Sequence, residues 1–109
     1  MLIDDLKTKW ATEGPERVGF VLENDLVVEV TNVHPQPLNN FDVPVEALIE
    51  FEDLAVATWH THPGGTSQLS LDDDAAFRAW PDLLHYIVGS DGVRAYRVDG
   101  TKLVQQHVG

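Results

Sequence analysis

The hydrophobic and polar positions along the chain alternate between a helical and an extended period. The N-terminal stretch MLIDDLKTKWATEG carries apolar residues at helical spacing, and Gly14 with Pro15 ends the predicted helix. The next segment, ERVGFVLENDLVVEVTNVH, contains two valine-rich runs that are typical of strands. The polar residues Glu23, Asn24 and Asp25 between these runs predict the turn of a β-hairpin.

The same two periods recur through the rest of the chain. PQPLNN is predicted to be a loop, and VPVEALIEFE a helix with Pro44 in its first turn. A buried strand is predicted from Leu54 to His60, followed by the loop THPGGTSQLS and by the helix LDDDAAFRAW. Ser70 is the natural N-cap of this helix, and Pro81 closes it. LHYIVGS, GVRAYRVDG and TKLVQQHV then predict three strands joined by glycine-containing turns.

The predicted order of elements is therefore α-β-β-α-β-α-β-β-β. Helices interleaved with strands predict an α/β fold, in which helices flank one mixed central β-sheet. The chain has 109 residues and shows no internal repeat or linker, which predicts a single domain over residues 1–109.

Composition and charge exclude several classes of protein. The formal net charge is −11, with 18 acidic and 7 basic residues, which argues against nucleic acid as a partner. The sequence has no cysteine, so it offers neither a disulfide framework nor a thiolate nucleophile. No apolar run reaches the roughly 20 residues of a membrane span, and the N-terminus lacks the features of a signal peptide. We therefore expect an intracellular, cytoplasmic protein that does not act at a membrane.

The stretch WHTHPGGTSQLSLDDD brings chemistry into this picture. His60 and His62 lie two apart at the end of the predicted strand, so both imidazoles point to the same side. The loop GGTSQL, which is predicted to be flexible, allows the chain to return, so that a carboxylate at the start of the next helix faces the two histidines. Two histidines and one aspartate would give a catalytic zinc ion its usual three protein ligands and leave one position for water. The simpler interpretation is that His60 and His62 are two polar loop residues that bind no metal.

The spacing of these residues resembles the JAMM, or MPN+, metallopeptidase signature. The form His-x-His-Pro-x6-Ser-x2-Asp is matched at every spaced position, from His60 to Asp73. That family also carries an upstream glutamate, and PERVGFVL places Glu16 three residues before Gly19 as the family pattern asks. Val18 stands where many members have cysteine. The resemblance extends through the asparagine-rich loop and the closing strands, and it is greatest to minimal prokaryotic or phage-tail members.

The resemblance implies a fold and a set of roles. The fold is the JAB/MPN fold, a three-layer sandwich similar to the cytidine deaminase architecture. His60, His62 and Asp73 would bind Zn²⁺, and Glu16 would act as the general base toward the attacking water. Ser70 would donate a hydrogen bond to the developing oxyanion. The implied reaction is hydrolysis of a peptide or isopeptide bond.

Simpler interpretations remain beside these roles. Ser70 is also a plain N-cap, and both roles can coexist, while Glu16 could be a surface strand residue. Asp72 and Asp74 are expected to be exposed first-turn residues favoured by the helix dipole. The remaining histidines, His34, His85 and His107, are expected at the surface or as satisfied core residues. Trp10, Trp59 and Trp80 are expected in the core, with Trp59 also placed to form a wall of the site.

Two other functional classes are alternatives to the peptidase. Relatives that lost the ligands act as assembly or interaction modules, for example in phage tails, but the intact five-residue set here argues against that role. A zinc deaminase on the similar fold would need a Pro-Cys-x-x-Cys element, which a chain without cysteine lacks. The expected partner is a protein or peptide substrate, such as a ubiquitin-like protein, a sulfur-carrier protein or a tail protein, ranked above cell-wall peptide. The oligomeric state is left open.

Overall fold

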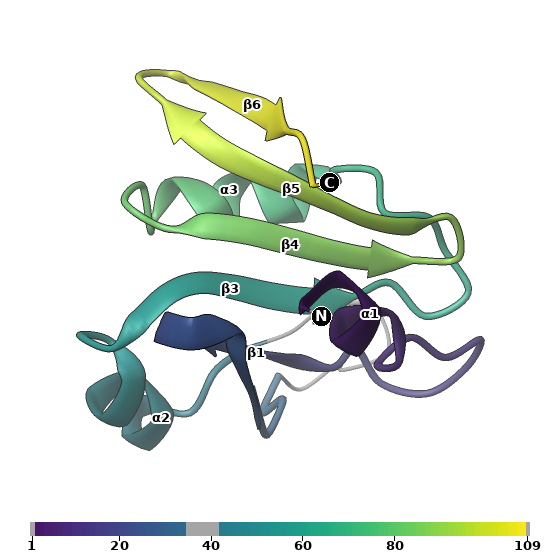
Figure 1. The fold of residues 1–109 in the computed structure, drawn as a ribbon, viewed down its shortest axis with the longest axis horizontal. Helices are drawn as coiled ribbons and strands as arrows, with labels where there is room; N and C mark the ends of the chain where they lie inside the picture. The colour runs from purple at the N-terminus through teal and green to yellow at the C-terminus, as the bar shows by residue number, and fades with distance from the viewer. Residues whose placement is uncertain (1, 35–41, 109) are drawn as a thin grey trace.

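The computed structural model describes residues 2–34 and 42–108, which form a mixed β-sheet with helices against both of its faces (Figure 1). The helices are α1 (Leu2–Lys7), α2 (Val45–Phe51) and α3 (Leu71–Arg78). The strands are β1 (Val18–Leu22), β2 (Leu26–Val30), β3 (Ala55–Thr61), β4 (Leu84–Gly89), β5 (Gly92–Asp99) and β6 (Lys102–Gln106). The predicted order of elements and the α/β sandwich are therefore confirmed.

The sheet has the strand order β2-β1-β3-β4-β5-β6. Strands β3 and β4 pair in parallel, whereas the other neighbours pair antiparallel. A parallel pair needs a crossover, and α3 supplies it between β3 and β4. Because β3 lies between β1 and β4, its carboxyl end is flanked on both sides by other strands.

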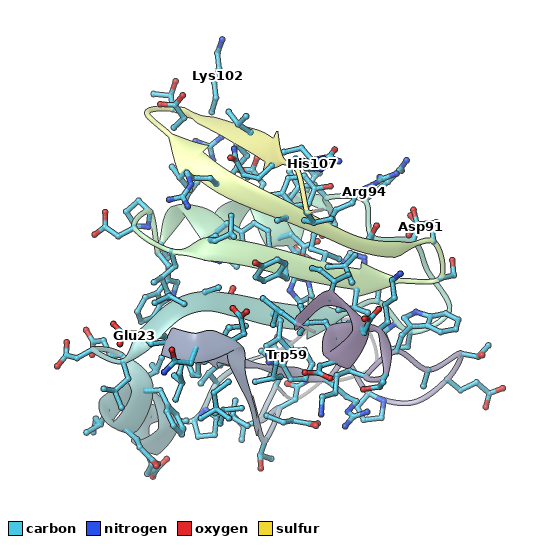
Figure 2. All side chains as sticks on the ribbon, viewed as in Figure 1. Glu23, Trp59, Asp91, Arg94, Lys102 and His107 are labelled. Carbon is cyan, nitrogen blue, oxygen red and sulfur yellow. The ribbon has the colours of Figure 1, made fainter. Side chains whose placement is uncertain are left out.

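The two faces of the sheet have separate hydrophobic clusters. On one face, Leu6 of α1 packs against β-strand residues that include Trp59 and Val88. On the other face, Phe77 of α3 packs against Ile87 and Tyr96. Figure 1 shows α1 in front of the sheet and α3 behind β4 and β5, and Figure 2 shows Trp59 next to α1. The sandwich therefore has three layers.

Local sequence explains the hairpin and one close approach between strands. Asn24 and Asp25 adopt φ values of 64° and 61° in the turn between β1 and β2, a conformation that Asn and Asp tolerate better than most residues. Gly19 lies under the indole of Trp59, which donates a hydrogen bond from Nε1 to the carbonyl of Val28 at 3.2 Å. A Cβ atom at Gly19 would come within 1.9 Å of that carbonyl oxygen, so only glycine fits there.

Three predicted boundaries differ from the structure or lie outside it. The first helix ends at Lys7 rather than at Gly14, and the chain continues in tighter turns, in which the Lys9 N–H donates to the Leu6 carbonyl at 3.0 Å. Strand β3 is shifted by one residue from the predicted range 54–60. The predicted loop PQPLNN lies outside the described residues. Among the described residues, no helix is long and apolar enough to cross a membrane.

Candidate metal centre

The register between β1 and β3 brings the upstream glutamate to the two histidines. Val18 pairs with His60 in the antiparallel ladder. The ladder continues beyond β1, because the Thr61 N–H donates to the Arg17 carbonyl and the Arg17 N–H donates to the Thr61 hydroxyl, both at 2.9 Å. Extending this register by one residue places Glu16 opposite His62. Directly opposed residues share a face of the sheet, so Glu16 lies on the same face as both histidines.

Four side chains converge at this point. The Nε2 atoms of His60 and His62 are 3.2 Å apart. Asp73 places Oδ1 at 2.7 Å from Nε2 of His60 and Oδ2 at 3.0 Å from Nε2 of His62. A carboxylate oxygen of Glu16 and nitrogens of both histidines lie within 4.8 Å of one another. The four side chains that were singled out in sequence as ligands and base are thus neighbours.

The N-terminus of α3 holds Asp73 in place through a capping box. The Ser70 hydroxyl oxygen accepts a hydrogen bond from the Asp73 N–H at 3.1 Å, and Oδ2 of Asp73 accepts one from the Ser70 N–H at 3.0 Å. The predicted N-cap role of Ser70 is therefore confirmed. An accepting hydroxyl still carries its own proton, so capping leaves Ser70 able to act as a donor as well.

A backbone carbonyl fixes the orientation of His62. Its Nδ1–H donates to the Thr66 carbonyl oxygen at 2.7 Å, because a carbonyl can only accept. When the imidazole is protonated, its Nε2–H also donates to Oδ2 of Asp73 at 3.0 Å, and in the neutral imidazole Nε2 carries the lone pair that a metal ion would take. Metal-binding histidines usually show this arrangement, in which one ring nitrogen donates and the other is left for the ion.

The loop that carries Thr66 is anchored to the turn between β4 and β5, whereas the sequence predicted a flexible segment. The Ser67 N–H donates to Oδ1 of Asp91 at 2.8 Å, and Asp91 lies at that turn (Figure 2). The Ser90 N–H also donates to the Gly65 carbonyl at 2.8 Å. A Cβ atom at Gly89 would lie 2.2 Å from the backbone at Thr66 and Ser67, so this glycine lets the loop approach the strand.

Burial and mutual contacts change the acidity of the site. Desolvation raises the pKa of the Glu16 carboxyl to about 7. Of the smaller effects, the charge of His62 lowers this pKa and the charge of Asp73 raises it. Burial alone would raise the pKa of Asp73, but hydrogen bonds with His60 and His62 outweigh it and hold that pKa well below its usual range. Burial lowers the pKa of His60, which keeps its imidazole neutral. For His62, the effect of burial is outweighed by Asp73 and Thr66, and its pKa is raised.

The donor set fits a zinc ion. Ligand atoms held at about 2.0–2.1 Å from a tetrahedral zinc lie about 3.3 Å from one another. The separations of 2.7, 3.0 and 3.2 Å among the His60, His62 and Asp73 atoms are close to that value. Without a metal these contacts are hydrogen bonds from the histidines to the Asp73 carboxylate, and a cation would replace their protons and bind the same nitrogen and oxygen atoms. The carboxylate of Glu16 adds an oxygen as a fourth donor group beside this set.

Sequence reasoning missed the residues that support this set. The Trp10 indole donates to the His62 carbonyl at 2.9 Å, although its spacing had placed Trp10 in the first helix. The Asn32 amide donates to the Glu16 carbonyl at 2.8 Å, and its Oδ1 accepts from the Asp42 N–H at 3.0 Å. These are contacts to backbone atoms between residues distant in sequence, so no spacing in the sequence signals them.

The other histidines, tryptophans and aspartates named in the sequence analysis lie outside the metal centre. His85 is buried, donates from Nε2 to the Trp80 carbonyl at 2.9 Å and accepts from the Thr58 hydroxyl at 2.7 Å, as expected of a satisfied core histidine. Trp59 packs in the cluster under α1, so it is a core residue and its ring does not line the metal centre. The remaining residues of this group are His107 and Asp72, which are exposed, and His34, Asp74, Trp10 and Trp80, which are partly buried.

Known proteins resemble this chain in sequence and in fold. Residues 6–99 match the family described as prokaryotic homologs of the JAB domain, and the chain belongs to that family. Protein DSY2949 from Desulfitobacterium hafniense, whose structure was solved in solution, is similar in fold, with a TM-score of 0.65 and 18% sequence identity. The match covers 84% of this chain and 75% of that one. Among curated proteins, none matches this sequence.

Proposed function

We propose that this chain is a zinc-dependent hydrolase of peptide or isopeptide bonds, of the JAMM type. The observation that carries the proposal is the convergence of His60, His62 and Asp73 beside the buried carboxyl of Glu16. Membership of the JAB family supports it, because that family includes metallopeptidases. Such burial of polar groups costs free energy, which favours a chemical role over a purely structural one.

In this proposal, His60, His62 and Asp73 hold the ion. Bound there, zinc would supply a Lewis acid that polarises the scissile carbonyl and makes an attacking water more acidic. Asp73 remains ionised because its pKa is held low, and neutral His60 keeps a lone pair for binding. The capping box keeps the Asp73 carboxylate in one orientation when the substrate enters.

Glu16 and Ser70 act on the substrate itself. A carboxyl whose pKa lies about 7 is suited to take a proton from water and return it to the leaving amine. The Ser70 hydroxyl donates a hydrogen bond to the carbonyl oxygen as negative charge develops on it. From outside the site, the side chain of Asn32 holds the backbone carbonyl of Glu16, and the side chain of Trp10 holds that of His62.

The substrate class proposed is a small protein or peptide tail. The test is hydrolysis of a mixture of synthetic peptides by the zinc-loaded chain, followed by mass spectrometry. We expect cleavage that stops on addition of a chelator and returns with zinc. Stoichiometric zinc without cleavage of any peptide or ubiquitin-like tail would contradict the proposal and favour an assembly or interaction module that keeps the metal.

A further inference from the structure

A cavity of about 200 Å³ lies beside the metal centre, between α2, α3 and the sheet. Its floor is the sheet face that also carries the histidines, and its walls come from both helices. The lining residues that matter for the argument are Val18, Phe20, Leu48, His60, Phe77 and Trp80. We propose that this cavity receives an apolar side chain of the substrate next to the scissile bond, an inference that rests on the proposed function.

The cavity and the metal centre share a wall. The Nε2 atom of His60 contacts Asp73 at 2.7 Å, while the ring of His60 lies 5.8 Å from the ring of Phe77 and lines the cavity. Val18 lies on the floor of the cavity, and Glu16, two residues before it, points to the same face of the sheet. A peptide whose carbonyl lies between Glu16 and the metal ligands therefore has the cavity next to it.

The polar groups of the cavity already have partners. His85 and Thr58 are hydrogen-bonded to each other at 2.7 Å, and His85 also donates to the Trp80 carbonyl. The imidazole of His85 stacks on Phe77 with ring centroids 4.2 Å apart, so it presents a flat face rather than a donor. Asp42, at the edge, accepts from the Val43 N–H at 2.9 Å. Among the described residues, the cavity therefore offers a ligand a mainly apolar surface whose His85, Thr58 and Asp42 groups are already hydrogen-bonded.

The size of the cavity selects among apolar groups. Cavities of about 150 Å³ lined by apolar side chains can hold a benzene-sized molecule. The cavity here is of that order, which fits one leucine-sized or phenylalanine-sized side chain. The substrate class is therefore a peptide or protein tail with a large apolar residue beside the bond that is cut.

The test uses a variant that fills the cavity and a matched control. Ala76 lines the cavity, whereas its neighbour Ala75 on the same helix is exposed. Ala76→Phe should therefore block the cavity, and Ala75→Phe should add the same side chain outside it. Circular dichroism checks the fold of each variant. If Ala76→Phe does not fold, Leu48→Ala replaces it, because it enlarges the cavity and should shift the preference from leucine toward phenylalanine.

The first readout needs no catalysis. Methyl-region NMR spectra of the full chain are recorded during titration with N-acetyl-leucinamide, and with N-acetyl-glycinamide as the small-side-chain control. We expect shifts at the methyl groups of Val18 and Leu48 with the leucine probe only, retained in Ala75→Phe and lost in Ala76→Phe. Absence of these shifts in the unmodified chain, or equal shifts in Ala76→Phe, would overturn the inference.

The second readout separates this inference from the proposed function. Peptides that differ only in leucine or glycine beside the scissile bond should differ by about tenfold or more in kcat/KM, and Ala76→Phe should remove that preference. Cleavage without preference would overturn the cavity assignment while leaving the hydrolase proposal intact. Probe binding by a zinc-loaded chain that cleaves no peptide would support the cavity as an apolar ligand site and contradict the hydrolase proposal.

Discussion

Along β3, Ala57 and Trp59 point into the cluster beneath α1, whereas Thr58 and His60 point to the face covered by α2 and α3. The first face buries apolar side chains, with Trp59 at 0% exposure. The second face buries titratable groups as well, with Glu16 at 6% and His60 at 1%. Burial of such groups is unfavourable unless they are paired, so the second face gives up stability to assemble a site. The two faces can therefore be separated by mutation.

The largest effect is expected from Glu16→Gln, which changes only the second face. The amide keeps the shape of the side chain but cannot accept a proton at neutral pH, so turnover should fall by about 10⁴-fold. Zinc content and unfolding midpoint should be close to those of the unmodified chain. Steady-state peptide hydrolysis beside elemental analysis measures both. Turnover within a few-fold of the unmodified chain would remove Glu16 from the chemistry.

Trp59→Ala tests the first face. Truncation of a fully buried tryptophan leaves a large cavity and should lower the free energy of unfolding by about 3–5 kcal/mol. Urea denaturation followed by circular dichroism measures this loss. The fraction that stays folded should still bind zinc, because the indole lies on the opposite side of the sheet from His60. A loss below about 1 kcal/mol would show that the cluster under α1 is not the main source of stability.

Ser70 has two roles beside the second face: it caps α3, and in the proposed reaction it donates a hydrogen bond to the substrate. Two substitutions separate these roles. Ser70→Ala removes the cap and the hydroxyl, so it should cost about 1 kcal/mol of stability and reduce turnover by about 10²-fold. Ser70→Asp keeps a capping acceptor without a hydroxyl donor, so stability should return while turnover stays low. Recovery of both properties in Ser70→Asp would mean that Ser70 acts only as a cap.

His85 gives the smallest predicted effect, a pH dependence of stability. Burial lowers the pKa of His85 from 6.5 to about 4 in the folded chain. Between these values the unfolded chain binds more protons, so this contribution to stability is complete above pH 6.5 and is lost as pH falls toward about 4. The slope should be about 1 kcal/mol per pH unit. Denaturation of the metal-free chain across this range should show a shallower slope in His85→Gln, which does not titrate.

The sequence predicted the order of elements because each strand and helix carries a clear period and a turn signal. VGFVL reads as an apolar run because β1 is buried on both faces. Spacing within one strand and one loop placed His60 and His62 together and a carboxylate at the next helix start, whereas the family resemblance selected Asp73 and assigned Ser70 its role toward the substrate. The neighbourhood of Glu16 came from the family resemblance, and the register between β1 and β3 explains it physically.

The support around the site was not predictable in the same way. Trp10 lies beyond the end of α1 and donates to the His62 carbonyl, and Asn32 donates to the carbonyl of Glu16. The loop near Thr66 was predicted to be flexible, but contacts with the turn at Asp91 anchor it. These contacts join segments far apart in the chain, and they depend on backbone positions that no local pattern encodes.

We infer that His60 and His62 hold a metal ion, and the metal content of the purified chain tests this inference. Elemental analysis should give about one zinc per chain in the unmodified protein. The double variant His60→Ala with His62→Ala should contain none while keeping the fold, because the cluster around Trp59 is untouched. Equal zinc in both proteins, or no zinc in the unmodified chain after zinc is added back, would contradict the account.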